Sequence, residues 1–324
     1  MSPTLVGRRF GYTRIAAYEA VVPGSATYRS LVGQLNGLPS LPTVLAGERY
    51  YWPASANAAL AASLKAYYPT TPVANLVSID SLEAANTAQF MKDGTASDEL
   101  NRSADFGKKI AAAVFDWAKT DGYDNATPFT LPVGPGLWVP TPPAFAPPAF
   151  PNWIKSRPIV TGSDEAADQG GPTTYSEDPA SAYYAQAKEL YDISQNLTAD
   201  KRTAVLFWAD NPDGKSFTGP GHVNSILLQV MNDKKPTLDE AAQAFAYVGI
   251  TLTDATISVW KSKYNYFAMR PITYMRSVMN QPTWNTVIAT PARTPGLSRC
   301  PRRGPDDGCP GTHHAVRSQL QIHR

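Results

Sequence analysis

Nine prolines lie within residues 128–151, and they limit what the centre of this chain can fold into. Proline has no backbone N–H and a fixed φ angle, so such a stretch cannot form a regular helix or strand. Trp138, Phe145 and Phe150 lie among these prolines. Aromatic side chains are uncommon in disordered linkers. The stretch is therefore predicted to be a loop packed over the domain rather than a free linker.

The segments on both sides of this loop have the apolar spacing of amphipathic helices, and they end at proline or glycine. No run alternates with the period of a strand, and no internal repeat is present. The predicted fold class is all-α, built around a helical bundle with long proline-rich loops. The expected helices are Arg14–Val22, Ala54–Tyr68, Val77–Lys92, one from Ser97 towards Asp121, one after Pro179, one after Thr198, one over "PGHVNSILLQVM", one after Thr237, and Asp254 to about Arg270.

Several residue types mark where these helices should start. Ser97 and Thr198 have side-chain oxygens that can accept a first-turn N–H. Thr237 and Glu240 have the spacing of a capping box. Pro179 suits a first helical turn, because the N–H that proline lacks is not needed there.

Composition excludes some classes of function. The chain has 324 residues, 43% of them hydrophobic, which is enough for one large domain or two small ones. Its net charge of +2 provides no general electrostatic basis for binding nucleic acid or an anionic membrane. No apolar run reaches the roughly 18 residues of a membrane-spanning helix. The N-terminus lacks the residue order of a secretory signal.

The stretch "KYNYFAMRP" contains the candidate binding residues, Lys263 and Arg270. Seven positions correspond to two helical turns, so a continuous helix would place both cations on one face. A planar arginine fork and a compact lysine charge together suit a tetrahedral oxyanion such as phosphate or vanadate. Pro271 is expected to limit continuation of the helix. The alternative is a solvated lysine with an arginine that pairs with an acid.

"WKSKYNYFAMRPITYMRSV" resembles the first active-site motif, K-x6-R-P, of the vanadium-dependent haloperoxidase and type 2 phosphatidic acid phosphatase superfamily. The resemblance to its bacterial haloperoxidase-like branch extends from residue 2 to about residue 291. It implies an all-helical fold with a pocket for vanadate or phosphate, in which Lys263 and Arg270 contact the oxyanion. Other similar stretches are "FGYTRIAAYEAVVPG", "YRSLVGQLNGLP", "WPASANAAL", "YSEDPASAYYAQAKELY" and "FWADNPDGKSFTGPGHVNSI".

The resemblance also implies two later motifs, P-S-G-H-like and S-R-x5-H-like, which supply an acid–base histidine, a second arginine and a histidine nucleophile or vanadium ligand. Neither occurs at the family spacing. His222 resembles a residue of the helical body, and a structural role is expected for it. "PGTHHAV", at 310–316, is a near match that comes more than ten residues too late.

Residues 292–324 differ from the rest of the chain. They contain six arginines and no lysine, both cysteines, Cys300 and Cys309, and three of the four histidines. The cysteines could form half of a metal site, but the segment offers little to bury. Shifting the reading frame by one base from Leu297 permits "YPAAHAVV", with a histidine 31 positions after Arg270. The segment is therefore interpreted as an aberrant, disordered tail that arises from a frameshift, which resequencing codons 285–324 would test.

The expected organisation is an incomplete haloperoxidase-like helical domain over 1–291, followed by the aberrant tail 292–324. The leading function is peroxide-dependent halide oxidation with vanadate as cofactor. The alternatives are an acid phosphatase without a cofactor that acts on phosphomonoesters, a non-catalytic oxyanion-binding remnant and a helical interaction protein. No activity is expected of the chain as written, because the later motifs are absent.

The expected partner is a small-molecule substrate or oxyanion, and a homo-oligomer is left open. No nucleic acid and no integral membrane segment are expected. The family suggests export, although no signal peptide precedes the first expected helix, so localisation stays unassigned. The nearly cysteine-free body fits either redox compartment.

Overall fold

The computed structural model describes residues 3–168, 170–210 and 217–288. The helices are α1 (Pro3–Glu19), α2 (Trp52–Tyr67), α3 (Val73–Lys92), α4 (Ser97–Ala118), α5 (Ser163–Ala166), α6 (Ala182–Gln195), α7 (Ala199–Phe207), α8 (Gly219–Lys234), α9 (Leu238–Tyr266) and α10 (Pro271–Ser277). Two 3-10 helices, η1 (Val22–Gly24) and η2 (Pro151–Lys155), lie between them. The described part of the chain has no strand, so the predicted all-α fold is confirmed. None of its helices is long and apolar enough to cross a membrane.

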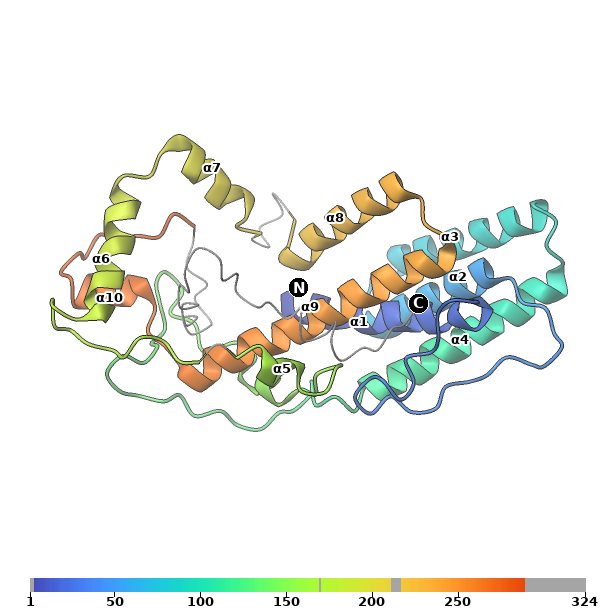
Figure 1. The fold of residues 1–324 in the computed structure, drawn as a ribbon, viewed down its shortest axis with the longest axis horizontal. Coiled ribbons are helices and arrows are strands. Elements are labelled where there is room, and N and C mark those ends of the chain that lie inside the picture. Colours follow the sequence, from blue (N-terminus) through green and yellow to red (C-terminus); the bar gives the residue numbers. More distant parts are fainter. Residues whose placement is uncertain (1–2, 169, 211–216, 289–324) are drawn as a thin grey trace.

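The main core lies where α1 packs against α9 on one side and against α2 and α4 on the other. Figure 1 shows α9 running diagonally through the molecule, with α2, α3 and α4 at one end and α6, α7 and α10 at the other. The two cations of interest lie towards the latter end, because Lys263 is in the last turn of α9. Large core side chains include Tyr12, Ile15, Ile110, Val114, Trp117 and Ile250.

A close crossing of two helices explains why α9 is longer than predicted. The sequence predicts separate helices on either side of Gly249, but α9 is one continuous helix of 29 residues. A Cβ on Gly249 would lie 3.1 Å from the Cα of Gly11, and a Cβ on Gly11 would lie 2.2 Å from Thr253 Oγ1. These glycines let α1 and α9 approach each other closely. The packing gained there outweighs the roughly 1 kcal/mol that glycine costs inside a helix.

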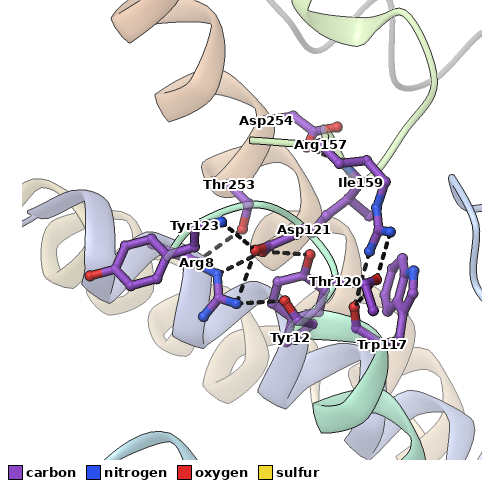
Figure 2. A network of polar contacts seen from close by, with 12 residues as sticks. Arg8, Tyr12, Trp117, Thr120, Asp121, Tyr123, Arg157, Ile159, Thr253 and Asp254 are labelled. Atoms are coloured by element: carbon purple, nitrogen blue, oxygen red, sulfur yellow. Dashed lines mark hydrogen bonds and ion pairs between the residues drawn. The ribbon is translucent and has the colours of Figure 1, made fainter. Parts of the chain in front are cut away.

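A buried ion pair explains why α1 begins at Pro3 and not at the predicted Arg14. The side chain of Arg8 is buried, and its Nε donates to Asp121 Oδ2 at 2.7 Å (Figure 2). The hydroxyl of Tyr12 donates to the same oxygen at 2.9 Å. Burial alone would lower the pKa of Arg8, but its hydrogen bond to Asp121 and the charge of Asp121 raise it. Arg8 and Tyr12 are thus part of the core, and the helix that carries them starts before the predicted Arg14.

Asp254 attaches the middle of α9 to the loop that precedes α5. Its carboxylate is fully buried and accepts hydrogen bonds from the backbone N–H of Ile159 at 2.7 Å and of Val160 at 2.9 Å. The Ser163 hydroxyl donates to it at 2.8 Å. Burial raises the pKa of Asp254 to about 6, although these hydrogen bonds act in the opposite direction. The carboxylate therefore fixes the chain that leaves the proline-rich loop against α9.

The proline-rich loop packs on the carboxyl end of α9, as predicted. Trp138 is fully buried in a cluster with Tyr264 and Phe267. The carbonyl of Ala149 accepts hydrogen bonds from the Tyr264 hydroxyl at 2.6 Å and from Trp260 Nε1 at 3.3 Å. The other two aromatic residues of the loop are not buried: Phe145 is 64% exposed and Phe150 is 41% exposed.

Two of the four predicted helix starts are confirmed. Thr198 accepts the Lys201 N–H at 3.3 Å, and Thr237 with Glu240 forms the capping box. The prediction for Ser97 is wrong, since Ala96 is the N-cap residue of α4. The prediction for Pro179 is also wrong. Ser181 caps α6 instead, because its side-chain oxygen accepts the Tyr184 N–H at 3.2 Å.

Candidate functional site

Lys263 and Arg270 lie on either side of a turn, not on one helical face as predicted. α9 ends at Tyr266, and Phe267 caps it in the left-handed conformation, with φ 47° and ψ 37°. The Phe267 N–H still donates to the Lys263 carbonyl at 3.0 Å. The chain therefore leaves the helix axis one turn after Lys263, and Arg270 belongs to the next element.

Arg270 is the N-cap residue of α10. Its backbone is extended, with φ −78° and ψ 146°, and its carbonyl accepts the N–H groups of Thr273 at 3.0 Å and Tyr274 at 3.3 Å. Pro271 was predicted to limit a helix, but it is the first residue of a new one. Its fixed φ and missing N–H suit that position. The first turn of α10 thus holds the backbone of Arg270 in place.

The two cations are close enough for the charge of Arg270 to affect the pKa of Lys263. Burial, followed by the charge of Arg270, lowers the pKa of Lys263 to about 8. Burial lowers the pKa of Arg270 to about 10. The Lys263 ammonium also lies 5.7 Å from the ring centroid of Trp260. The turn at Phe267 thus brings together the two cations that the sequence motif paired, although by a different local geometry.

These electrostatics fit an oxyanion. Burial disfavours the charged form of both Lys263 and Arg270, and their mutual repulsion disfavours it further at Lys263. A tetrahedral anion between them would offset both effects. The arginine fork can donate two parallel hydrogen bonds to it, and the ammonium can donate a third. Phosphate, sulfate and vanadate are all tetrahedral and negatively charged at neutral pH.

We expect oxyanion affinity to fall as the pH rises through about 8, where Lys263 loses its proton. Arg270, with a pKa of about 10, stays charged over that range, so residual affinity should persist. Sulfate is a suitable probe, because its own charge does not change near neutral pH. Titration calorimetry at a series of pH values would measure this. An affinity that stays constant through pH 8 would contradict the role given to Lys263.

Comparison with solved structures identifies the fold. A bacterial vanadium-dependent iodoperoxidase superposes with a TM-score of 0.78 and 28% sequence identity, over 91% of this chain and 71% of that one. The chain has the fold of the vanadium-dependent haloperoxidases. The holo and apo forms of a bacterial vanadium-dependent chloroperoxidase share this fold, with TM-scores of 0.61 and 0.58.

The chloroperoxidase structures are less similar to this chain than the iodoperoxidase is. They are 17% and 19% identical to it, and the likeness covers 86% of this chain but only 65% and 66% of theirs. No protein-family profile matches the chain. A comparison with curated proteins also finds no match.

A cavity of about 350 Å³ adjoins the segment that carries Arg270 in this haloperoxidase-like fold. Met269 and Pro271, the two neighbours of Arg270, line it together with residues of α6 and α10. The lining is mainly apolar and includes Tyr183, Ala187, Leu190, Ile193 and Tyr274. The volume lies within the range of small-molecule pockets. The cavity is therefore large enough for a small organic molecule beside this segment.

His222 has the surroundings of a packed side chain, consistent with the structural role expected for it. It is 8% exposed, and its Nδ1 lies 2.9 Å from Asp210 Oδ1. Its ring stacks on Trp208 with centroids 5.0 Å apart, and the edge contact with Phe207 is 5.2 Å. These contacts hold the N-terminus of α8 against the end of α7.

Other sequence predictions fall outside the described residues. Cys300, Cys309, "PGTHHAV" and the whole tail 292–324 belong to this group. Among the residues that the structure describes, no group of three or more His, Cys, Asp and Glu side chains could hold a metal ion. The sequence analysis also missed the contacts of Trp138 and Trp260 with this site. The signal available for Trp138 was its position as an aromatic residue among the prolines of residues 128–151.

Proposed function

We propose that this protein is a vanadium-dependent haloperoxidase-like enzyme that oxidises halide with hydrogen peroxide. The observation that supports this most directly is the pair of partly buried cations, Lys263 in the last turn of α9 and Arg270 just before α10. The fold is that of the superfamily. Lys263 and Arg270 would hold vanadate, which supplies, when bound, the centre at which peroxide oxidises the halide.

The two side chains would have different tasks in this proposal. Arg270 would orient the oxyanion, because a planar guanidinium fixes two of its oxygens. Lys263 would neutralise negative charge on the oxyanion. Its site is partly shielded from water, and the attraction between opposite charges is stronger there than in bulk water. The remaining acid–base and ligand histidines would come from the later motifs of the superfamily. The chain as written, whose residues 292–324 lack those motifs, is proposed to bind the oxyanion without turnover.

The test compares two proteins in two assays. The first protein is the chain as written, and the second is the product of the source gene with the reading frame restored from Leu297. Each is assayed for iodide oxidation by hydrogen peroxide with and without vanadate, since one structural neighbour is an iodoperoxidase. Each is also assayed for phosphate release from a phosphomonoester without vanadate.

We expect vanadate-dependent iodide oxidation by the restored protein and none by the chain as written. Phosphate release by the restored protein without iodide oxidation would replace the proposal with an acid phosphatase, which could use the same cations. Oxyanion binding by both proteins without turnover in either assay would instead indicate a binding remnant.

A further inference from the structure

The proline-rich loop pairs with the segment between the two cations. Leu137 and Ala268 form an isolated antiparallel bridge. On one side of it the Trp138 N–H donates to the Phe267 carbonyl at 2.8 Å, and on the other the Met269 N–H donates to the Gly136 carbonyl at 2.9 Å. Met269 directly precedes Arg270. The backbone that brings Arg270 towards Lys263 is thus fixed by a loop more than a hundred residues earlier in the chain.

The bridge holds the Phe267–Met269 turn, whose backbone conformation is unfavourable for its residues. Phe267 has a positive φ of 47°, and a bulky residue in the left-handed region costs about 1–3 kcal/mol. Trp138 helps to hold it, since its ring meets that of Phe267 edge-on with centroids 5.7 Å apart. Phe129 and Tyr264 surround the other sides at 6.1 and 5.9 Å. The turn therefore depends on packing that the loop provides.

The loop is also fixed to the helix that follows Arg270. Gly136 has φ +74°, and a Cβ there would lie 2.5 Å from Tyr175 Cγ, so only glycine fits. The ring of Tyr175 in turn meets the ring of Tyr274 in α10 at 6.0 Å. Trp138 therefore connects the loop to the turn before Arg270, and Gly136 connects it through Tyr175 to the helix after Arg270.

We propose that Trp138 is a positioning residue for the oxyanion pocket, which acts by holding the Phe267–Met269 turn that places Arg270 beside Lys263. The proposal rests on the proposed function in that Lys263 and Arg270 bind the oxyanion. Trp138 itself touches no ligand. Its indole Nε1, buried and without a hydrogen-bond partner among the described residues, is not needed for this role.

The first test compares three variants of the full chain, with sulfate affinity as the readout. Trp138→Ala should weaken binding about tenfold or more, since a displaced Arg270 loses a charge-assisted contact of about 1.5–3 kcal/mol. Trp138→Phe, which keeps an aromatic ring and the bridge, should bind as the wild type does. The matched control is Trp153→Ala. Trp153 is also a tryptophan, is 3% exposed, and its Nε1 likewise has no hydrogen-bond partner within the described part of the chain.

The pH profile separates positioning from a general loss of stability. The charge of Arg270 contributes to the lowered pKa of Lys263. Trp138→Ala should therefore move the fall in sulfate affinity to a pH above about 8, whereas Trp153→Ala should leave it there. If both alanine variants weaken binding equally and keep the same profile, Trp138 has only a structural role and the proposal is wrong.

A measurement on the wild-type chain avoids the risk that Trp138→Ala does not fold. If anion binding depends on the Phe267–Met269 turn, then by thermodynamic linkage the bound anion must also stabilise that turn. Sulfate should slow hydrogen exchange at the Trp138 and Met269 amides and leave the Ile159 and Val160 amides unchanged. Binding without this protection overturns the proposal. Sulfate affinity that is unchanged in Lys263→Met and Arg270→Ala would instead overturn the proposed function.

Discussion

Asp121→Asn should lower the free energy of unfolding by about 3–5 kcal/mol, because it leaves a buried arginine without its counter-charge. The carboxylate of Asp121 is 4% exposed and accepts hydrogen bonds from Arg8 Nε, Arg8 Nη2 and the Tyr12 hydroxyl. The Tyr123 N–H also donates to it, at 2.9 Å. Asparagine keeps the shape but loses the charge, and its amide N–H₂ would face the donors that the carboxylate accepts.

The chain contains a matched control on its surface. Lys65 and Asp80 form an ion pair with the same 2.7 Å distance as Arg8 and Asp121, but their side chains are 37% and 60% exposed. Asp80→Asn should change the free energy of unfolding by less than about 1 kcal/mol, because solvent screens the pair. Urea denaturation at pH 7 would measure both variants. Equal effects at the two sites would show that burial of Arg8 is not what makes Asp121 important.

A double variant tests whether Arg8 and Asp121 stabilise the fold as a pair or independently. Arg8→Met in the Asp121→Asn background removes the uncompensated cation, so the double variant should be more stable than Asp121→Asn alone. A double variant that is less stable by the sum of both single effects would mean that Arg8 and Asp121 act independently.

Lys263→Met should raise stability and lower oxyanion affinity. At pH 7 Lys263 is protonated in both the folded and the unfolded chain, and only the folded chain holds that charge away from water. Removing the charge should increase the free energy of unfolding by about 1–2 kcal/mol, after allowance for solvent screening. Loss of one charge-assisted contact should weaken sulfate binding by about 10- to 150-fold.

The pH dependence of this stability gain has a defined sign. The pKa of Lys263 is about 8 in the folded chain and near its ordinary value of 10.5 when unfolded. Between these values the unfolded chain binds more protons, so the wild type becomes more stable as the pH rises. The advantage of Lys263→Met should therefore shrink from about pH 8 upward. A constant advantage across this range would mean that lost charge is not its cause.

A charge-matched variant controls for general electrostatics. Lys108 has a side chain that is 53% exposed, and it lies in α4 at the other end of the molecule (Figure 1). Lys108→Met removes the same net charge and should leave sulfate affinity unchanged. If it weakens binding as much as Lys263→Met does, sulfate responds to the overall charge and not to a pocket.

The sequence analysis paired Lys263 and Arg270 but placed them on one helix. The charge of Arg270 does contribute to the lowered pKa of Lys263. The inferred single helix was wrong, because Phe267 adopts a left-handed conformation that phenylalanine rarely takes. Nothing local to "YNYFAMRP" predicts that turn. The hydrogen bonds and aromatic packing from residues 129–138 stabilise it, and these are contacts between distant parts of the chain.

The sequence by itself determined the helical class, most of the helices and several of their starts, because these depend on apolar periodicity, proline, glycine and capping side chains near each other in the chain. It also identified the cationic pair. Only the tertiary structure decided that α9 runs through Gly249, that Arg8 is buried against Asp121 and that the proline-rich loop holds the turn before Arg270. Each of these depends on the free energy of contacts between residues far apart in sequence, which local patterns do not encode.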